Sequence, residues 1–202
     1  MKLKKWEIAL FISVCILMLS GFKVDRDVTA LSDKLIRLHV VANSDSEEDQ
    51  AVKLKVRDAV LEMLDPMLDG ECGKDGAEDV ISGHMDDIVA AAEKTLYENG
   101  YSYKVSAKLA EESFPTVDYD TFSLPAGEYT SLRIVIGEGE GHNWWCVVFP
   151  SLCTAAAVEY DDDSTLTDAE TALITRENPH YIIKFKIAEI IGSLKQLFVN
   201  GQ

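Results

Sequence analysis

The most distinctive hydrophobic pattern lies at the N-terminus. Three lysines within the first five residues precede an apolar run from Ile8 to Phe22, interrupted only by small or weakly polar residues. A basic start followed by an apolar stretch is typical of an export signal, and this stretch is short for a membrane span of about 20 residues. We therefore predict that residues 1–22 form an N-terminal export helix, either a signal peptide or a signal anchor, and that the polar residues 23–34 form a linker.

An alternating pattern from Leu35 to Ala42 predicts the first strand. Its even-numbered residues are all apolar, whereas the odd-numbered ones include Arg37 and His39. Side chains on a strand point alternately to the two faces of the sheet. We expect the all-apolar face to pack against the core.

Two helices are expected after this strand. The segment 43–46 offers short polar side chains that cap free backbone N–H groups, and the acidic residues 47–49 follow where the helix dipole favours negative charge. Apolar residues recur at helical spacing as far as Leu64, and Pro66 is expected to help end this helix. A second apolar stripe predicts a helix over residues 77–98.

Three further strands are expected. Strict alternation from Tyr101 to Ala110 predicts a half-buried strand that is antiparallel or lies at a sheet edge, and the following residues, 113–130, are expected to be irregular. Ser131–Ile136 and Trp144–Phe149 are the other two, and the latter is apolar on both faces, which favours a central position. Their glycine-rich connection predicts a hairpin with a long loop.

The C-terminal part begins with an acidic stretch, 161–163, which is expected to be a solvated loop. Asn178-Pro179 is typical of a helix start, and residues 183–197 fit a final helix, although alternation over residues 181–187 also fits a strand. The predicted fold class is α+β, with a small, mostly antiparallel sheet backed by two or three helices. We expect residues 35–202 to form a single acidic ectodomain with a C-terminal helix.

The charge of the chain restricts its partners. The formal net charge is −16, and it becomes more negative without the basic N-terminal segment. An acidic surface repels phosphate backbones and anionic lipid headgroups. We therefore expect no nucleic-acid partner, and membrane contact only through the N-terminal segment.

The cysteines fit an oxidising compartment. If the chain is exported, Cys146 and Cys153 are close enough in sequence to form a disulfide, with Pro150 between them to turn the chain. Cys72 then remains as a free thiol or an intermolecular partner.

The sequence gives only a weak indication of catalytic residues. His142 lies four residues before Cys146, which suggests an exported hydrolase with a thiolate nucleophile. On a strand, however, these residues would be about 13 Å apart. The four histidines lack metal-ligand spacing, and nothing singles out a pair of carboxylates. We therefore expect no catalytic residues, no cofactor and no metal.

The segment 137–145 is a better candidate for recognition. Glycines at 137, 139 and 141 resemble a phosphate-binding loop, but such loops open a helix, whereas this one leads into a strand. A mobile hairpin tip that contacts a partner is the better interpretation. In Trp144-Trp145 the two indoles would face opposite sides of a strand, so that either both pack in the core or one is exposed as an interface anchor.

Two stretches together resemble a known family. The first runs from His39 through Val40-Val41-Ala42-Asn43-Ser44-Asp45 to Asp58. The second runs from Leu132 through the glycine loop to Asn143-Trp144-Trp145-Cys146-Val147, and on to Cys153. Both are similar to the stage II sporulation protein R family of endospore-forming bacteria. The resemblance covers about residues 1–153, including the export segment.

The resemblance implies a signalling protein and not an enzyme. Members of the family are made in the forespore and exported toward the mother cell. The resemblance therefore implies that this chain is secreted across the forespore membrane into the intermembrane space, either released or membrane-anchored. The resemblance implies that the chain there activates a membrane-embedded aspartic protease of the mother cell, which cleaves the inhibitory segment from a pro-sigma factor. The alternatives are a hydrolase that uses His142 and Cys146, and an anchored structural envelope protein.

The expected partner-binding surface combines the helix start with the glycine loop, because their polar residues are more specific than packing requires. Its candidate residues are His39, Asn43, Ser44, Asp45, Asp49, Gln50, Lys53, Arg57, Asp58, Gly139, Gly141, His142, Asn143, Trp144 and Trp145.

Overall fold

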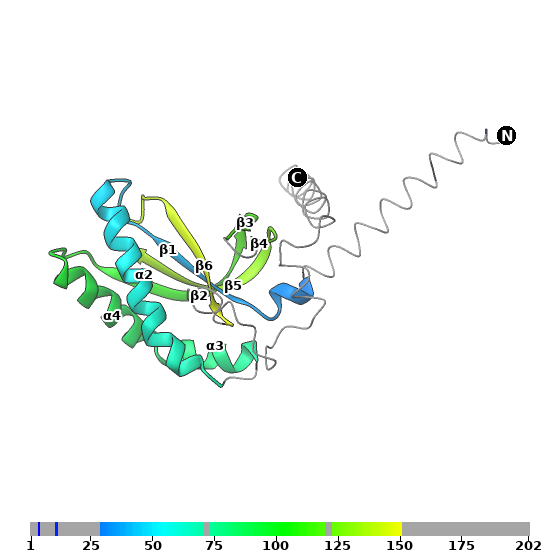
Figure 1. The fold of residues 1–202 in the computed structure, drawn as a ribbon, viewed down its shortest axis with the longest axis horizontal. Coiled ribbons are helices and arrows are strands. Elements are labelled where there is room, and N and C mark those ends of the chain that lie inside the picture. Colours follow the sequence, from blue (N-terminus) through cyan, green and yellow to red (C-terminus); the bar gives the residue numbers. More distant parts are fainter. Residues whose placement is uncertain (1–3, 5–10, 12–28, 71–72, 120–122, 151–202) are drawn as a thin grey trace. The chain divides into compact units, whose positions relative to one another are not determined.

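The computed structural model describes residues 29–70, 73–119 and 123–150, together with Lys4 and Phe11 (Figure 1). The expected export helix, the acidic stretch at 161–163 and the C-terminal helix lie outside the described residues. Of the expected linker, residues 29–32 form one helical turn.

The chain divides into two compact units. One comprises residues 32–112 and 128–167, and the other comprises residues 1–31, 113–127 and 168–202. The first unit holds the three helices and most of the main sheet, and the candidate site is built on it.

The described part of the second unit contains a small antiparallel hairpin, formed by β3 (Val117–Asp118) and β4 (Ser123–Leu124). The Ser123 hydroxyl donates a hydrogen bond to the Asp118 carboxylate. This region was expected to be irregular, because two-residue strands are too short to produce an alternating pattern.

The main sheet has four strands in the order β2-β5-β1-β6. These are β1 (Ile36–Val41), β2 (Val105–Phe114), β5 (Gly127–Ile136) and β6 (Asn143–Phe149). The central strand β1 pairs in parallel with β5 and antiparallel with β6. The sheet is therefore mixed.

The contacts between β2 and β5 show that these two strands run in opposite directions. The Gly137 amide donates to the Lys104 carbonyl at 2.8 Å, whereas the Thr130 hydroxyl donates to the Glu111 carboxylate at 2.6 Å. Later residues of one strand thus meet earlier residues of the other. The β1–β5 pair is then the parallel exception in the expected, mostly antiparallel sheet.

The expected hairpin of residues 131–136 and 144–149 is wrong, because β1 lies between β5 and β6. The expected central position for the second of these strands is wrong too, since β6 forms an edge of the four-stranded sheet. Cys146, Val147 and Val148 are nevertheless buried. Burial of both faces does not require a neighbouring strand on both sides. The expected edge position of β2 is confirmed, although β2 starts at Val105 and not at Tyr101.

The first helix, α2 (Glu47–Leu68), continues past the proline that was expected to help end it. Pro66 lies in the last turn, where it removes one backbone hydrogen bond. Leu64 and Leu68 on either side of it are buried, and the Asp69 amide donates to the Asp65 carbonyl at 3.0 Å. Packing of the last turn therefore outweighs the cost of the proline.

The second expected helix is two helices, α3 (Lys74–Gly83) and α4 (Met85–Glu98). The break falls at His84, whose backbone departs from helical angles. Its amide donates to the carbonyls of Val80 and Ile81, both at 3.2 Å. Apolar periodicity continued across this break, so the sequence pattern did not reveal it.

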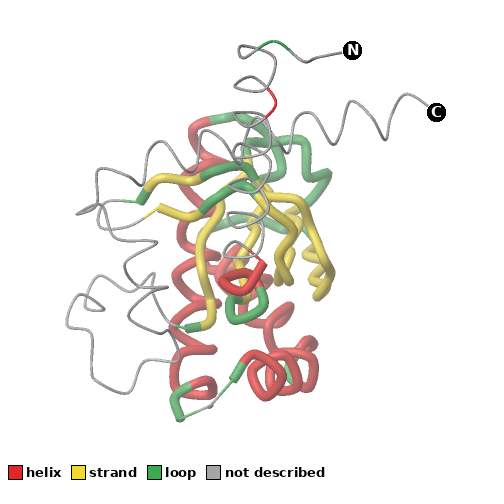
Figure 2. Tube along the Cα trace, turned by 90° about the vertical axis from the view of Figure 1, so that its right-hand side faces the viewer, coloured by secondary structure: helices red, strands yellow, loops and turns green. Residues whose placement is uncertain are grey.

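The core lies between the sheet and the helices. Ile36, Leu38 and Val40 of β1 belong to it, which confirms the expected inner face. Helices α2 and α4 lie side by side and contribute their buried stripes to the same core. Figure 2 shows the helices, in red, next to the strands, in yellow.

Candidate functional site

The N-terminus of α2 is held by a cluster of short polar side chains. The Ser46 hydroxyl caps the helix by accepting from the Asp49 amide at 3.1 Å. The buried Asp49 carboxylate in turn accepts from the Asn43 amide group at 2.8 Å and from the Ser44 hydroxyl at 2.6 Å. The expected helix start at residues 43–49 is therefore confirmed, and its charged groups point into the protein as well as to solvent.

Asp49 is charged despite its burial. Burial by itself raises the pKa of this carboxyl, but hydrogen bonds from Ser44, Asn43 and Tyr103 outweigh it, and the net pKa is lowered from its ordinary value. Burial, together with the same contact with Asp49, raises the pKa of Tyr103. The ionised carboxylate of Asp49 thus connects the start of α2 to Tyr103, which precedes β2.

The glycine loop, residues 137–142, is fixed to this helix start by its backbone. The amides of Glu140 and Gly141 donate to the carbonyls of Asn43 and Ala42 at 3.2 and 3.0 Å. The Glu138 amide donates to the Asn43 side-chain oxygen at 3.1 Å. The loop was expected to be a mobile hairpin tip. Instead it connects two strands that do not pair with each other, and its backbone is hydrogen-bonded to the helix start.

The far end of the loop is held by two charged residues. The amide of His142 donates to Asp45 Oδ1 at 2.7 Å, and its ring lies 2.5 Å from the same oxygen. Lys53 Nζ donates to the His142 carbonyl at 2.9 Å and to Gln50 Oε1 at 2.6 Å. Burial lowers the pKa of Lys53, and Arg57 lowers it further, while Asp45 raises it in part.

The glycine spacing follows from this close packing. Gly137 has a φ of +58°, and a Cβ atom there would stand 2.2 Å from Asn43 Oδ1. A Cβ atom on Gly141 would stand 2.3 Å from the Ser44 carbonyl oxygen. Only glycine fits at such approaches. We call residues 43–53 and 137–142, with the contacts described above, the loop-anchoring network.

The two tryptophans lie on opposite faces of β6, as expected. Trp144 packs against the core, and the guanidinium carbon of Arg57 stands 4.5 Å from the centroid of its ring. The side chain of Arg57 also donates to Asp58. Trp144 is thus a packing residue on the flank of α2.

Trp145 lies on the face of the sheet that is turned away from the helices. Its ring centroid is 6.1 Å from that of His39, which is the residue opposite it on β1. His39 Nδ1 lies 2.9 Å from Glu112 Oε2, and Nε2 lies 2.9 Å from Asn143 Oδ1. This histidine therefore connects β2, β1 and β6.

Glu112 completes this second cluster. Its other oxygen accepts from Arg133 at 2.9 Å. Burial raises its pKa, but hydrogen bonds from His39 and Arg133 outweigh burial, so that the net pKa is lowered. The carboxylate is ionised and shared between two cationic or polar partners.

The structure places the candidate residues in three groups. The loop-anchoring network holds Asn43, Ser44, Asp45, Asp49, Gln50, Lys53, Gly139, Gly141 and His142. The flank of α2 holds Arg57, Asp58 and Trp144, and the second sheet face holds His39, Asn143 and Trp145. Their role in partner binding stays a prediction.

Sequence reasoning missed Tyr103, Glu112 and Arg133. Glu112 lies 73 residues from His39 along the chain, so no local pattern connects them. The one available signal was Arg133, a charged residue within the apolar run of β5, because a charge there needs a partner.

Cys146 is disulfide-bonded, and the other cysteines lie outside the described residues, so its expected pairing with Cys153 stays a prediction. Within the described ranges, no group of three or more His, Cys, Asp or Glu side chains could hold a metal ion. No helix in that same part of the chain is long and apolar enough to cross a membrane.

The fold and the site define a small α+β protein in which a glycine loop is bonded to the start of a helix. The family described as stage II sporulation protein R matches residues 32–159. A curated relative, stage II sporulation protein R of Bacillus subtilis (strain 168), is 33% identical over 160 residues, which cover 77% of this chain and 71% of the relative. No solved structure gives a significant match. The chain belongs to the stage II sporulation protein R family, and the resemblance seen in its sequence is confirmed.

Proposed function

We propose that this protein is an exported signal of sporulation that activates a membrane-embedded aspartic protease in the mother cell. In this proposal residues 1–22 carry the chain across the forespore membrane into the intermembrane space. The activated protease then processes a pro-sigma factor. The chain acts by being recognised and does not itself catalyse a reaction.

Family membership is the observation that carries this proposal. The matched region, residues 32–159, includes the whole loop-anchoring network and the cluster around Trp145. The polar groups of the network bond to one another and to the loop backbone, which suits a surface of fixed shape. The disulfide at Cys146 fits an oxidising compartment outside the cytosol.

The test is complementation in an endospore-forming strain that lacks its own family member. We expect the full chain to restore cleavage of the pro-sigma factor, followed by immunoblotting through sporulation. A chain without residues 2–22 should accumulate in the forespore cytosol and restore no cleavage. Cleavage restored by this truncated chain, or absent with a stably produced full chain, would contradict the proposal.

The hydrolase alternative loses its nucleophile in this structure. A sulfur held in a disulfide cannot act as a thiolate, and Cys146 is disulfide-bonded. The anchored envelope protein differs from the released signal in its mature N-terminus. Mass spectrometry of the exported protein distinguishes the two, because a released signal lacks residues 1–22.

A further inference from the structure

The two layers of the main unit differ in charge. The helices α2, α3 and α4 carry 13 acidic and 5 basic residues, a net charge of −8. The strand residues that point away from the helices carry Arg37, Lys108 and Arg133 against the single carboxylate of Glu112. In a chain with a net charge of −16, this second face of the sheet is a basic exception.

One half of this second face is open. At its closed end, Arg37, Ser131 and Val147 lie across neighbouring strands and are 0% exposed. At its open end, Trp145 and Val135 are half-buried and Asn143 is exposed. The open end therefore presents an aromatic ring, an aliphatic side chain and an amide at one surface.

Two cations flank these groups. Arg133 is the β5 neighbour of His39, and its side chain is 35% exposed. Lys108 is exposed on β2, four residues after Lys104, while Arg133 lies four residues before Gly137. Because Lys104 and Gly137 are hydrogen-bonded, Lys108 and Arg133 lie at about the same level of adjacent antiparallel strands.

The nearby carboxylate offsets the charge of Arg133, because Glu112 is bonded to both His39 and Arg133. The excess positive charge of this end of the face therefore resides on Lys108. Among the described residues Lys108 forms no ion pair. We call Lys108, Arg133, Val135, Asn143 and Trp145 the basic half-face.

We propose that the basic half-face docks an acidic segment of the membrane-embedded protease. This inference rests on the proposed function and adds the chemistry of the partner. Carboxylates of the segment would meet Lys108 and Arg133, while an apolar side chain would lie against Trp145, since half-exposed tryptophan is a typical anchor of interfaces. Charge complementarity would then select this face over the acidic helical layer.

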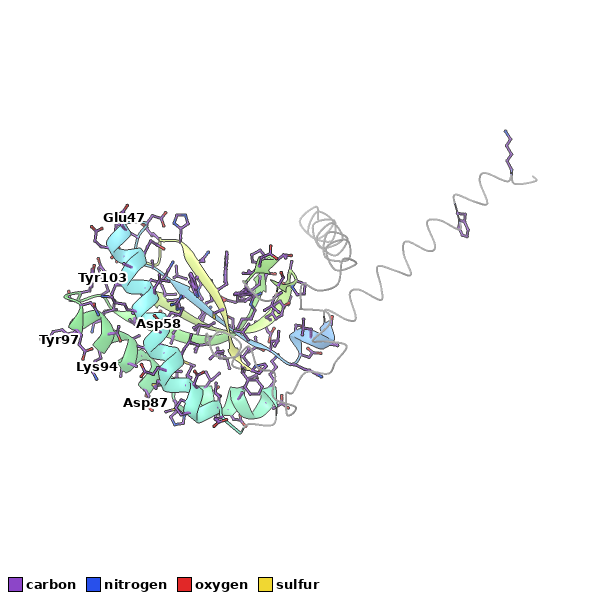
Figure 3. The ribbon with its side chains drawn as sticks, in the orientation of Figure 1. Glu47, Asp58, Asp87, Lys94, Tyr97 and Tyr103 are labelled. Atoms are coloured by element: carbon purple, nitrogen blue, oxygen red, sulfur yellow. The ribbon has the colours of Figure 1, made fainter. Side chains whose placement is uncertain are left out.

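The test measures binding of the purified full chain to the protease in nanodiscs of zwitterionic phosphatidylcholine, which carries no net charge. We expect Lys108→Glu to weaken binding about tenfold, because it replaces an attraction by a repulsion. Lys94→Glu is the matched control, since Lys94 is 75% exposed on α4, and its affinity should stay within about twofold. Figure 3 shows Lys94 together with Tyr97 on this helix.

A second pair of variants tests the aromatic anchor. Trp145→Ala should weaken binding about tenfold, as for a typical interface anchor, whereas Tyr97→Ala, which removes a side chain 80% exposed on α4, should leave it unchanged. Urea unfolding of each variant verifies that the fold is intact. The affinity of the wild-type chain should also fall as salt is raised, because screening weakens exposed charge pairs.

The outcomes separate this inference from the proposed function. Equal losses in Lys108→Glu and Lys94→Glu, or no loss in either, would overturn the docking face while leaving the activator role intact. Binding of the wild-type chain to phosphatidylglycerol vesicles without protease, lost in Lys108→Glu, would assign the face to anionic lipid instead. A wild-type chain that does not bind the protease at all would overturn the proposed function itself.

Discussion

Gly137 lies directly against the side chain of Asn43: a Cβ atom on the glycine would stand 2.2 Å from Asn43 Oδ1. The same oxygen accepts a hydrogen bond from the Glu138 amide. Residues 94 and 95 positions apart in the sequence are thus fitted to each other at the level of single atoms. The glycine loop is consequently part of the folded structure of the helix start and not an appendage to it.

Gly137→Ala is therefore expected to destabilise the protein. The substitution adds a Cβ at a φ of +58° and forces Asn43 away from its partners. Left-handed backbone and the loss of the part-buried hydrogen bond from Asn43 to Asp49 together cost about 2–4 kcal/mol in the free energy of unfolding. Urea unfolding of the purified chain measures this difference.

Gly83→Ala is the control for this substitution. Gly83 lies in α3, and nothing stands within 4 Å of a Cβ atom there. Alanine should be neutral or stabilise by up to about 1 kcal/mol, since it favours the helix over glycine. Equal destabilisation by both substitutions would show that the contact between Gly137 and Asn43 is not the cause.

Local features of the fold could be predicted from the sequence. The inner face of β1 was evident from Ile36, Leu38 and Val40, because alternation depends only on neighbouring residues. The start of α2 was evident for the same reason. The position of β1 between β5 and β6 could not be predicted, since strand order depends on contacts between residues about 100 positions apart. A hairpin was the natural expectation for two strands joined by a glycine loop.

The candidate site shows the same division. The polar residues within 43–53 and the glycine loop were both recognised as candidates. The hydrogen bonds that join these two segments to each other could not be recognised from the sequence. Glu112 was missed because its role depends on His39 and Arg133, which lie on different strands. Unusual polar residues can be found from sequence, whereas their pairing needs the tertiary structure.

Lys53→Met tests whether the loop depends on a buried cation. Lys53 is 3% exposed and donates to the His142 carbonyl and to Gln50. Methionine fills a similar volume but leaves both acceptors unsatisfied, which should lower the free energy of unfolding by about 1–3 kcal/mol. Lys55→Met is the control, because Lys55 is exposed and bonds only to Asn99 among the described residues; its effect should stay within about 0.5 kcal/mol.

The same variant can be followed in the loop itself. Amide hydrogen exchange at His142 should become faster in Lys53→Met than in the wild-type chain, because the loop loses an anchor. Unchanged exchange, together with unchanged stability, would show that the Lys53 contact contributes nothing to the loop.

Cys146 should be protected from alkylation in the exported protein. Its sulfur is disulfide-bonded, so iodoacetamide under denaturing conditions should modify it only after reduction. Mass spectrometry of the unreduced digest should find the peptide of Cys146 linked to that of Cys153, the pairing predicted from the sequence. A fully alkylated Cys146 in unreduced protein would contradict the disulfide, and a link to Cys72 would contradict the pairing.

The charge of Asp49 makes the helix start sensitive to acid. Hydrogen bonds from Ser44, Asn43 and Tyr103 lower its pKa below the ordinary value of 3.8 in spite of burial. The ionised carboxylate therefore stabilises the folded chain fully at neutral pH, and this contribution is lost as pH falls below about 4 and through the lowered pKa. Asp49→Asn should reduce the free energy of unfolding by about 1–3 kcal/mol at pH 7.

The decisive measurement is the difference between the wild-type chain and Asp49→Asn across pH. It should be constant above about pH 5 and shrink as the pH falls toward 3, since protonation removes the advantage of the carboxylate. Glu62→Gln, at an exposed position of α2, should show no such trend. A difference that stays the same at pH 7 and pH 3 would mean that the shape of the side chain, and not its charge, holds Asn43 and Ser44 in place.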